Sequence, residues 1–243
     1  MAHNLIFIFV NFWIVLGAIL LFMAPFYALY RYKHYRARQP KVGFNQHLEY
    51  FFASKEADYL IFFWALSEAV FWFVIPEFLL LLIIFMRVRK RFDMLIYDIA
   101  GTVVGTCIAL AMHLSNQSLV HLPYIKQGMI DQTYQWFHDF GIFGLLYQPF
   151  SGVPYKVFTH TFQGTALAII GFIIFAIIVR LARYVIAYAI LSRLYPFFHK
   201  YVYRNYIPLF LIAVFLFSVM LLKISNKYGE GYQVTTRAIT INK

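Results

Sequence analysis

Long apolar stretches constrain most strongly what this 243-residue chain can fold into. Five of them cover residues 4–30, 59–86, 94–114, 164–191 and 206–222, and a sixth, 141–163, is interrupted by glycine and proline. A helix needs roughly 20 apolar residues to cross the hydrocarbon core of a bilayer. Charged residues make up only 13% of the chain, against about 25% in soluble domains. The sequence therefore predicts an all-α polytopic membrane protein and excludes a water-soluble globular domain.

The positions of the basic residues predict how the chain is threaded. Lysine and arginine number 21 against 10 acidic residues, and they cluster beside apolar segments, so topology and anionic lipid headgroups explain them before nucleic acid does. Basic clusters within 31–41 and 87–91 flank the stretch 59–86 on both sides. The positive-inside tendency places both clusters in the cytoplasm, so 59–86 does not cross. We expect a re-entrant hairpin that enters from the cytoplasm and breaks near Ile75–Pro76, because proline removes a backbone donor.

A second broken segment follows one crossing later. The stretch 94–114 crosses outward and carries Gly101 and Gly105 at i, i+4, a spacing that favours close helix packing. An external loop with an amphipathic helix around residues 127–139 comes next. The stretch 141–163, broken at several points including Pro154, is then expected to be a hairpin entering from the opposite face.

Each hairpin is followed by a transmembrane helix that contains glycine, namely 94–114 and 164–191. This order is typical of inverted-repeat transporters, which bind substrate near the middle of the bilayer. We expect residues 55–205 to form that membrane domain. A helix and basic segment, 1–54, would precede it, and a helix and tail, 206–243, would follow.

Five ionisable residues stand inside apolar surroundings, where each costs at least ~2.5–3.5 kcal/mol to insert. They are Glu68, Glu77, Lys156, Arg180 and Arg183. Two interpretations remain open from the residues alone. The five pair off and hold the two repeats together, or they line a shared polar cavity.

Each of these residues suggests a particular chemistry. Glu68 lies among aromatic residues, whose low polarity would let it exchange a proton near neutral pH, while Glu77 follows Pro76 at the expected start of a half-helix. Arg180 and Arg183 share a helix face at i, i+3, so they either grip a phosphate as two planar forks or extend to the headgroups.

Other polar residues give weaker signals. His160 is best explained by a satisfied polar contact, and Asp98, beside Tyr97, is either an interfacial residue or a further acid of the cavity. We find no metal-ligand spacing, nucleophile motif or phosphate-binding glycine loop, and expect neither a cofactor nor a metal nor an enzyme.

Two stretches resemble a known family. Ser67–Glu68 with Val74 to Leu80 (VIPEFLL) resembles the first hairpin of the DedA membrane proteins, also called SNARE-associated or VTT-domain proteins. The segment 152–159 (GVPYKVFT), with RLARY at 180–184, resembles the second hairpin and following helix of the YqaA-like branch. The likeness covers about residues 55–195. Three positions depart from the family pattern: Glu77, Ala109 and Val179.

The resemblance implies two opposed re-entrant hairpins and movement of phosphate-headed lipids between leaflets, such as undecaprenyl phosphate or phospholipids, in some members tied to the proton gradient. We therefore expect a flippase or scramblase of a bacterial inner membrane. Its partners would be anionic lipids and protons, with no nucleic acid, and self-association stays open. Lys156, Arg180 and Arg183 would hold the phosphate, and Glu68 and Glu77 would balance its charge. The rival hypotheses are a proton-coupled carrier of a small soluble ion and a non-transporting assembly or envelope-integrity scaffold.

Overall fold

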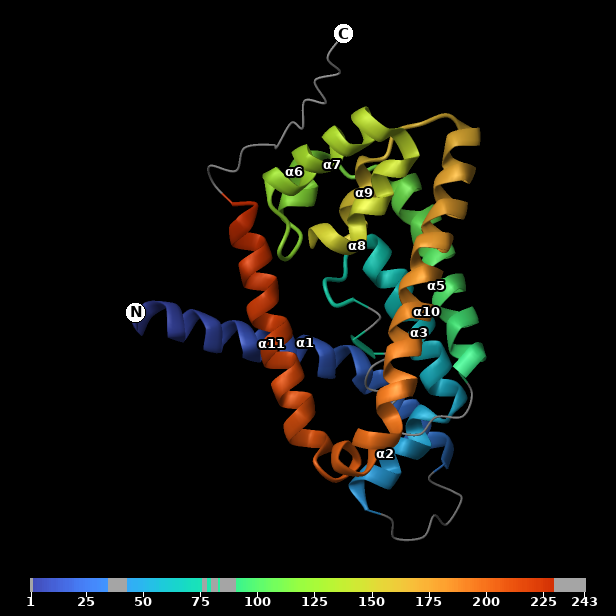
Figure 1. Ribbon diagram of the computed structural model, residues 1–243, viewed down its shortest axis with the longest axis vertical. Coiled ribbons are helices and arrows are strands. Elements are labelled where there is room, and N and C mark those ends of the chain that lie inside the picture. Colours follow the sequence, from blue (N-terminus) through green and yellow to red (C-terminus); the bar gives the residue numbers. More distant parts are fainter. Residues whose placement is uncertain (1, 35–42, 76–77, 80–82, 84–90, 230–243) are drawn as a thin grey trace.

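The computed structural model describes residues 2–34, 43–75, 78–79, 83 and 91–229, and every regular element in these ranges is a helix (Figure 1). Pro76 and Glu77 lie outside the described residues. The elements are α1 (Ala2–His34), α2 (Phe44–Phe52), α3 (Lys55–Val70), α5 (Arg91–Met112), α6 (Asn116–Val120), α7 (Gln127–Phe140), η1 (Gly141–Tyr147), α8 (Gln148–Ser151), α9 (Tyr155–Thr161), α10 (Ala166–Arg204) and α11 (Tyr206–Lys227).

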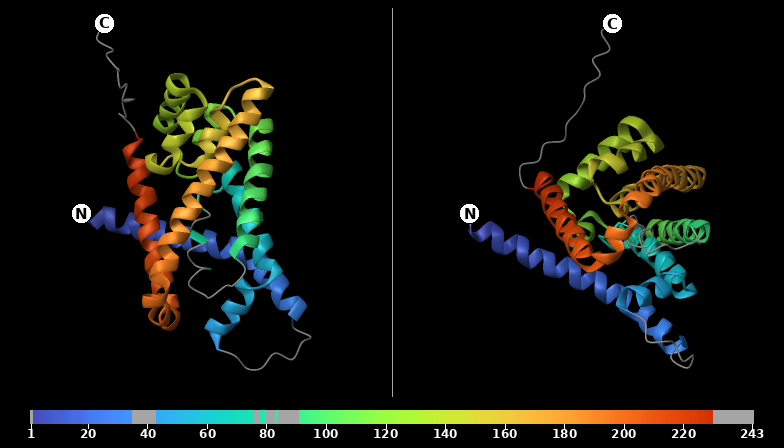
Figure 2. Two further views of the ribbon diagram at one scale, coloured as in Figure 1. Left: turned by 45° about the vertical axis from the view of Figure 1, so that its right-hand side comes forward. Right: turned by 60° about the horizontal axis from the view of Figure 1, so that its bottom comes forward.

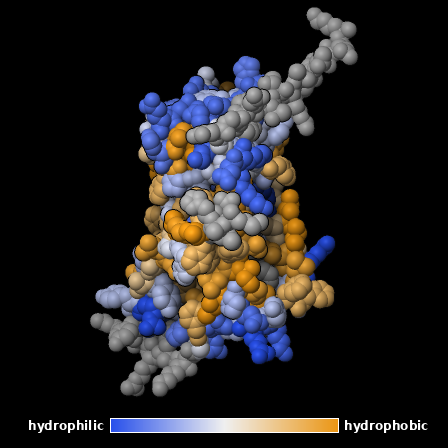
Figure 3. All heavy atoms as spheres, turned by 90° about the vertical axis from the view of Figure 1, so that its left-hand side faces the viewer, coloured by the Kyte–Doolittle hydropathy of each residue, from blue (hydrophilic) through white to orange (hydrophobic). Residues whose placement is uncertain are grey.

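Four of the described helices are long and apolar enough to span a membrane. The spanning parts are Ile6–His34 of α1, Met94–Met112 of α5, Ala166–Leu191 of α10 and Tyr206–Lys227 of α11. On one face of the molecule, hydrophobic residues gather in the middle and hydrophilic ones at both ends (Figure 3). These features indicate an integral membrane protein with the four crossings that the apolar stretches predict.

The molecule has two ends, which we name by the helices that they carry (Figure 1). The α2 end also holds the last turn of α1, the start of α5 and the turn between α10 and α11. The α7 end holds α6, α7, the start of α10 and the end of α11. The chain leaves the α2 end along α3 and is back at that end when α5 begins.

Helix α3 is short and stops inside the molecule. Its 16 residues give about 24 Å of length at 1.5 Å per residue, less than a bilayer core. It ends at Val70, where Phe71 leaves the helix with φ −148°. The expectation of a break near Ile75–Pro76 was therefore wrong by about one turn, because contacts from α9, described below, end the helix earlier.

Helix α10 is longer than its apolar stretch predicts. It continues from residue 191 to Arg204, through Pro196, for 39 residues in all. The added residues are mainly aromatic and basic, a composition that suits the boundary between hydrocarbon and water. A helix can continue there although its apolar run has ended, so the predicted boundary at 191 marks the end of the apolar run and not the end of the helix.

Helices α3 and α5 pack backbone to backbone at the two predicted glycines. A Cβ added to Gly101 would lie 2.2 Å from the carbonyl oxygen of Phe62, and one added to Gly105 would lie 2.5 Å from that of Leu66. No side chain larger than hydrogen fits at such separations. Ala109, one turn further along α5, is fully buried.

The second broken segment lies beneath α7 at the α7 end. Helix α7 closely matches the amphipathic helix expected around residues 127–139. Its Trp136 ring stacks between Tyr147 of η1 and Phe158 of α9, with centroids 5.1 and 5.8 Å away and interplanar angles of 6° and 8°. Gly152 takes the left-handed conformation (φ 78°), and Pro154 then precedes the first residue of α9. The stack and the turn hold α9 in place below α7.

Helix α1 runs obliquely across α11 (Figure 2). A polar contact joins the two: Asn11 Nδ2 donates to Ser218 Oγ at 2.6 Å, and Tyr124 donates its hydroxyl to Asn11 Oδ1, also at 2.6 Å. At the α2 end, Lys33 pairs with buried Glu56 at 2.8 Å. Burial alone would raise the pKa of Glu56, but hydrogen bonds with Lys33 and with neighbouring groups outweigh burial and lower it. These contacts tie α1 to both ends of the bundle.

Candidate functional site

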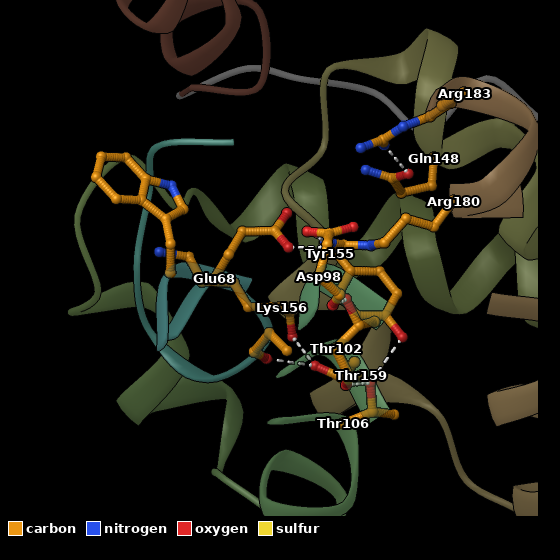
Figure 4. A network of polar contacts seen from close by, with 12 residues as sticks. Glu68, Asp98, Thr102, Thr106, Gln148, Tyr155, Lys156, Thr159, Arg180 and Arg183 are labelled. Atoms are coloured by element: carbon orange, nitrogen blue, oxygen red, sulfur yellow. Dashed lines mark hydrogen bonds and ion pairs between the residues drawn. The ribbon is translucent and has the colours of Figure 1, made fainter. Parts of the chain in front are cut away.

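Three charged side chains from three helices meet in the interior. Arg180 of α10 contacts Glu68 of α3 through Nη2 and lies 3.5 Å from Asp98 of α5 through Nη1 (Figure 4). Their exposed fractions are 5%, 2% and 2%. We call these three residues the charge triad. One guanidinium between two carboxylates makes use of the planar, multidentate geometry that distinguishes arginine from lysine.

An aromatic residue of α9 completes the arginine's surroundings. The guanidinium carbon lies 5.2 Å from the ring centroid of Tyr155, a distance at which cation and ring attract. The hydroxyl of Tyr155 lies 2.9 Å from that of Thr106 on α5. Both residues are buried, so α9 and α5 together hold the ring under the guanidinium (Figure 4).

Helix α9 also supplies hydrogen-bond donors to the end of α3. Lys156 Nζ donates to Phe71 O at 2.8 Å, Thr159 Oγ1 to Ala69 O at 3.0 Å, and His160 Nε2 to Val70 O at 3.2 Å. The last carbonyls of a helix have no partners within it, and its C-terminus attracts positive charge. Three neighbouring carbonyls are thus capped from α9, which explains why α3 ends where it does. The polar contact expected for His160 is confirmed.

Lys156 has no exposed surface and also lies 3.5 Å from Pro123 O. Its charge is close enough to Glu68 for the two to interact. Together with the charge triad it forms a group of two cations and two carboxylates whose formal charges sum to zero. Such balance lowers the cost of keeping charges away from water.

Arg183 has a different neighbour from Arg180. Its Nη1 donates to Gln148 Oε1 at 2.5 Å, at the start of α8, and Gln148 is itself buried. Arg183 is only half-buried. One arginine therefore contacts carboxylates of α3 and α5, and the other contacts an amide of the second broken segment (Figure 4). A joint grip of both on one phosphate stays a prediction.

The structure brings together Glu68, Lys156 and Arg180, three of the residues singled out from the sequence, with Arg183 one helical turn away. Asp98, for which the sequence left open an interfacial position or a further acid of the site, joins this group, because its side chain is buried 3.5 Å from Arg180. Helical periodicity offered a signal for this, since Asp98 precedes Gly101 by three residues and Gly105 by seven and so shares the face that packs on α3.

The described residues contain no group of three or more His, Cys, Asp or Glu side chains placed to hold a metal ion. Comparisons with protein-family models, curated proteins and solved structures found no match.

Proposed function

We propose that this protein moves phosphate-headed lipids between the leaflets of a bacterial inner membrane, in the manner of the DedA family, with protons as the coupling ion. One observation carries the proposal: a buried, charge-balanced cluster lies where two short segments, from opposite ends of the molecule, meet. Charges inside a membrane bundle are costly and mark ion or substrate pathways by default.

The geometry of the two segments supports the inverted arrangement. Helix α3 starts at the α2 end and stops inside the molecule (Figure 1). The segment from η1 to α9 starts at the α7 end, and the chain returns to the α7 end after it, where α10 begins. Their tips meet through the capping contacts of α9 on α3. Broken backbone at membrane depth needs such burial in protein or a water-filled cavity. We infer that both segments are re-entrant.

In this proposal the two arginines have different roles. Arg183, half-buried and bonded to a neutral amide, takes the lipid phosphate first. Arg180 turns toward the same phosphate, and a proton taken up at the two carboxylates, Glu68 and Asp98, then restores the charge balance of the group. Phosphate and proton thereby move together, while the acyl chains remain in the bilayer.

The proposal is tested with pure protein in liposomes that carry fluorescent phosphate-headed lipids, with and without an imposed proton gradient. We expect lipid movement that the gradient accelerates, and a loss of tenfold or more in Arg183→Lys, because lysine keeps the charge but loses the fork geometry. Arg193→Lys is the matched control, since Arg193 is an exposed arginine on the same helix, away from the site. Normal lipid movement by Arg183→Lys would refute the phosphate role.

The same liposomes separate the carrier of a small soluble ion from the lipid transporter. Release of entrapped inorganic phosphate, without lipid movement, would identify the soluble-ion carrier.

The scaffold hypothesis is favoured by one specific observation, the use of Lys156 as a cap with no exposed surface. On that hypothesis the charges only hold α3, α5, α9 and α10 together. Pure wild-type protein would then move lipid no faster than protein-free liposomes, and Glu68→Gln would lower the folded fraction without any transport phenotype.

A further inference from the structure

A cavity of about 440 Å³ lies at the α2 end, away from the charge triad. It is bounded by the start of α2 and by the turn that joins α10 to α11. We call it the interfacial cavity. Its volume falls within the range of about 300–1,000 Å³ that is typical of small-ligand sites.

The lining of the interfacial cavity contains polar residues and a cation. Arg204 and Gln46 both line it and are exposed. Asn45 Nδ2 donates to Tyr203 O at 2.6 Å, and this hydrogen bond joins two residues of the lining, one on α2 and one near the end of α10. The nearest acid of α2, Glu49, does not line the cavity and accepts a hydrogen bond from the Tyr203 hydroxyl at 3.5 Å. The described residues that line the cavity include Arg204 and no acid, so the cavity suits an anion.

The lining also contains exposed apolar residues. Phe44 is 57% exposed and Ile207 is 49% exposed, and both line the cavity. Ile207 belongs to the first turn of α11, which is long and apolar enough to span a membrane. The cavity therefore adjoins the apolar surface of that helix. The neighbouring part of α10 exposes Phe197 and Tyr201 (81% and 62%). Aromatic residues are enriched at the level of the lipid headgroups. These exposed aromatic residues therefore indicate that the cavity lies at the boundary between the headgroup region and the hydrocarbon core.

We propose that the interfacial cavity binds the headgroup of an anionic phospholipid from the leaflet at the α2 end. Arg204 contacts the phosphate, Gln46 donates from its amide, and Phe44 and Ile207 contact the upper acyl chain. The arginine attracts the negatively charged headgroup of the lipid, and the apolar residues contact its acyl chain. The two kinds of residue in the lining thus match the two parts of one amphipathic ligand. This proposal requires only that the chain spans a membrane. It can therefore be right or wrong independently of the proposed lipid transport.

The test measures binding of short-chain phosphatidylglycerol to the full chain in a neutral detergent, by native mass spectrometry and calorimetry. We expect Arg204→Gln to weaken binding about tenfold and Arg193→Gln, an exposed arginine of α10 outside the cavity, to leave it unchanged. Equal weakening by both variants would show general charge attraction and overturn the site. Unchanged binding in Arg204→Gln would overturn it as well.

Two further arms distinguish the ligand. Gln46→Glu places a negative charge in the cavity at an exposed position, so it should fold and weaken phosphatidylglycerol binding by a similar factor. Inorganic phosphate at the same concentration should not displace the lipid, because it makes no contact with the apolar residues of the lining. Displacement by inorganic phosphate, or equal binding of phosphatidylcholine, would overturn the assignment to an anionic lipid.

Discussion

Lys156 has no exposed surface, and its ammonium group donates to a backbone carbonyl, Phe71 O, at 2.8 Å. The cost of burying Glu68, Lys156 and Arg180 singly predicts that they lie near one another, and they do. The sequence did not predict that the ammonium of Lys156 contacts backbone carbonyls, because its acceptor on Phe71 lies 85 positions earlier in the chain. Every residue has a backbone carbonyl, so the pattern of side chains in a sequence does not show which carbonyl will accept the hydrogen bond.

Capping of α3 from α9 can be measured at Thr159. The Thr159 hydroxyl is shared between Ala69 O of α3 at 3.0 Å and Lys156 O of its own helix at 2.9 Å. Thr159→Val keeps the side-chain shape but leaves Ala69 O without this donor from α9, and we expect a loss of about 1–2 kcal/mol in the free energy of unfolding. The measurement is a denaturation curve of the protein in detergent.

The control for this experiment is Thr161→Val on the same helix. Thr161 is equally buried, but its hydroxyl donates to Val157 O within α9 itself. Removal of that bond leaves no carbonyl without a partner, since the helix supplies one. Equal losses in the two variants would show that the contact with α3 contributes nothing beyond a local hydrogen bond.

At the scale of elements, apolar length predicted the four helices that are long enough to span a membrane, and the polar and aromatic composition of residues 115–140 predicted the amphipathic helix α7. The ends of α3 and α10 were not predicted correctly, for two different reasons. Helix α3 ends early because of tertiary contacts from α9, which local sequence does not encode. Helix α10 ends late because hydropathy detects where the membrane stops, and an interfacial helix continues beyond that point.

The packing of α3 on α5 gives a test at this scale. Gly105→Ala would place a Cβ 2.5 Å from Leu66 O, so the helices must separate, and we expect a loss of about 1–3 kcal/mol. Separation also moves Asp98 on α5 away from Glu68 on α3, so the charge triad is disturbed. Gly17→Ala on α1, where nothing lies within 4 Å of an added Cβ, should cost no stability. The comparison is made by thermal denaturation in detergent, and similar melting of Gly105→Ala and wild type would contradict close packing.

At the scale of the whole molecule, the basic clusters predicted which segments share an end. The last turn of α1, the start of α5 and the turn after α10 lie together at the α2 end, while α7 lies at the other (Figure 1). Charge bias acts on loops and is therefore visible in sequence. The oblique course of α1 across α11 was not visible, because it depends on the contact of Asn11 with Ser218, 207 positions apart.

Threading through the membrane is tested with single cysteines in a Cys107→Ser background. We expect cysteines placed at Lys55 and Lys200, both exposed at the α2 end, to react with an impermeant thiol reagent from the cytoplasm only. A cysteine at His138, exposed on α7, should react from the opposite side only. Labelling of Lys55→Cys and Lys200→Cys from different sides would refute the shared end.

The meeting of Glu68, Asp98 and Arg180 also dictates an order of events during biosynthesis. Glu68 and Arg180 are 112 positions apart, so at about 5–20 residues per second the ribosome makes the acid some 6–22 seconds before its cation. Once Asp98 has also been made, the nascent chain holds two carboxylates without their arginine for the rest of that interval, each costing at least ~2.5–3.5 kcal/mol in hydrocarbon. We therefore expect helix α3 to stay outside the lipid or in a protected channel until α10 arrives, and any chain truncated before residue 180 to present unmatched acids to membrane quality control.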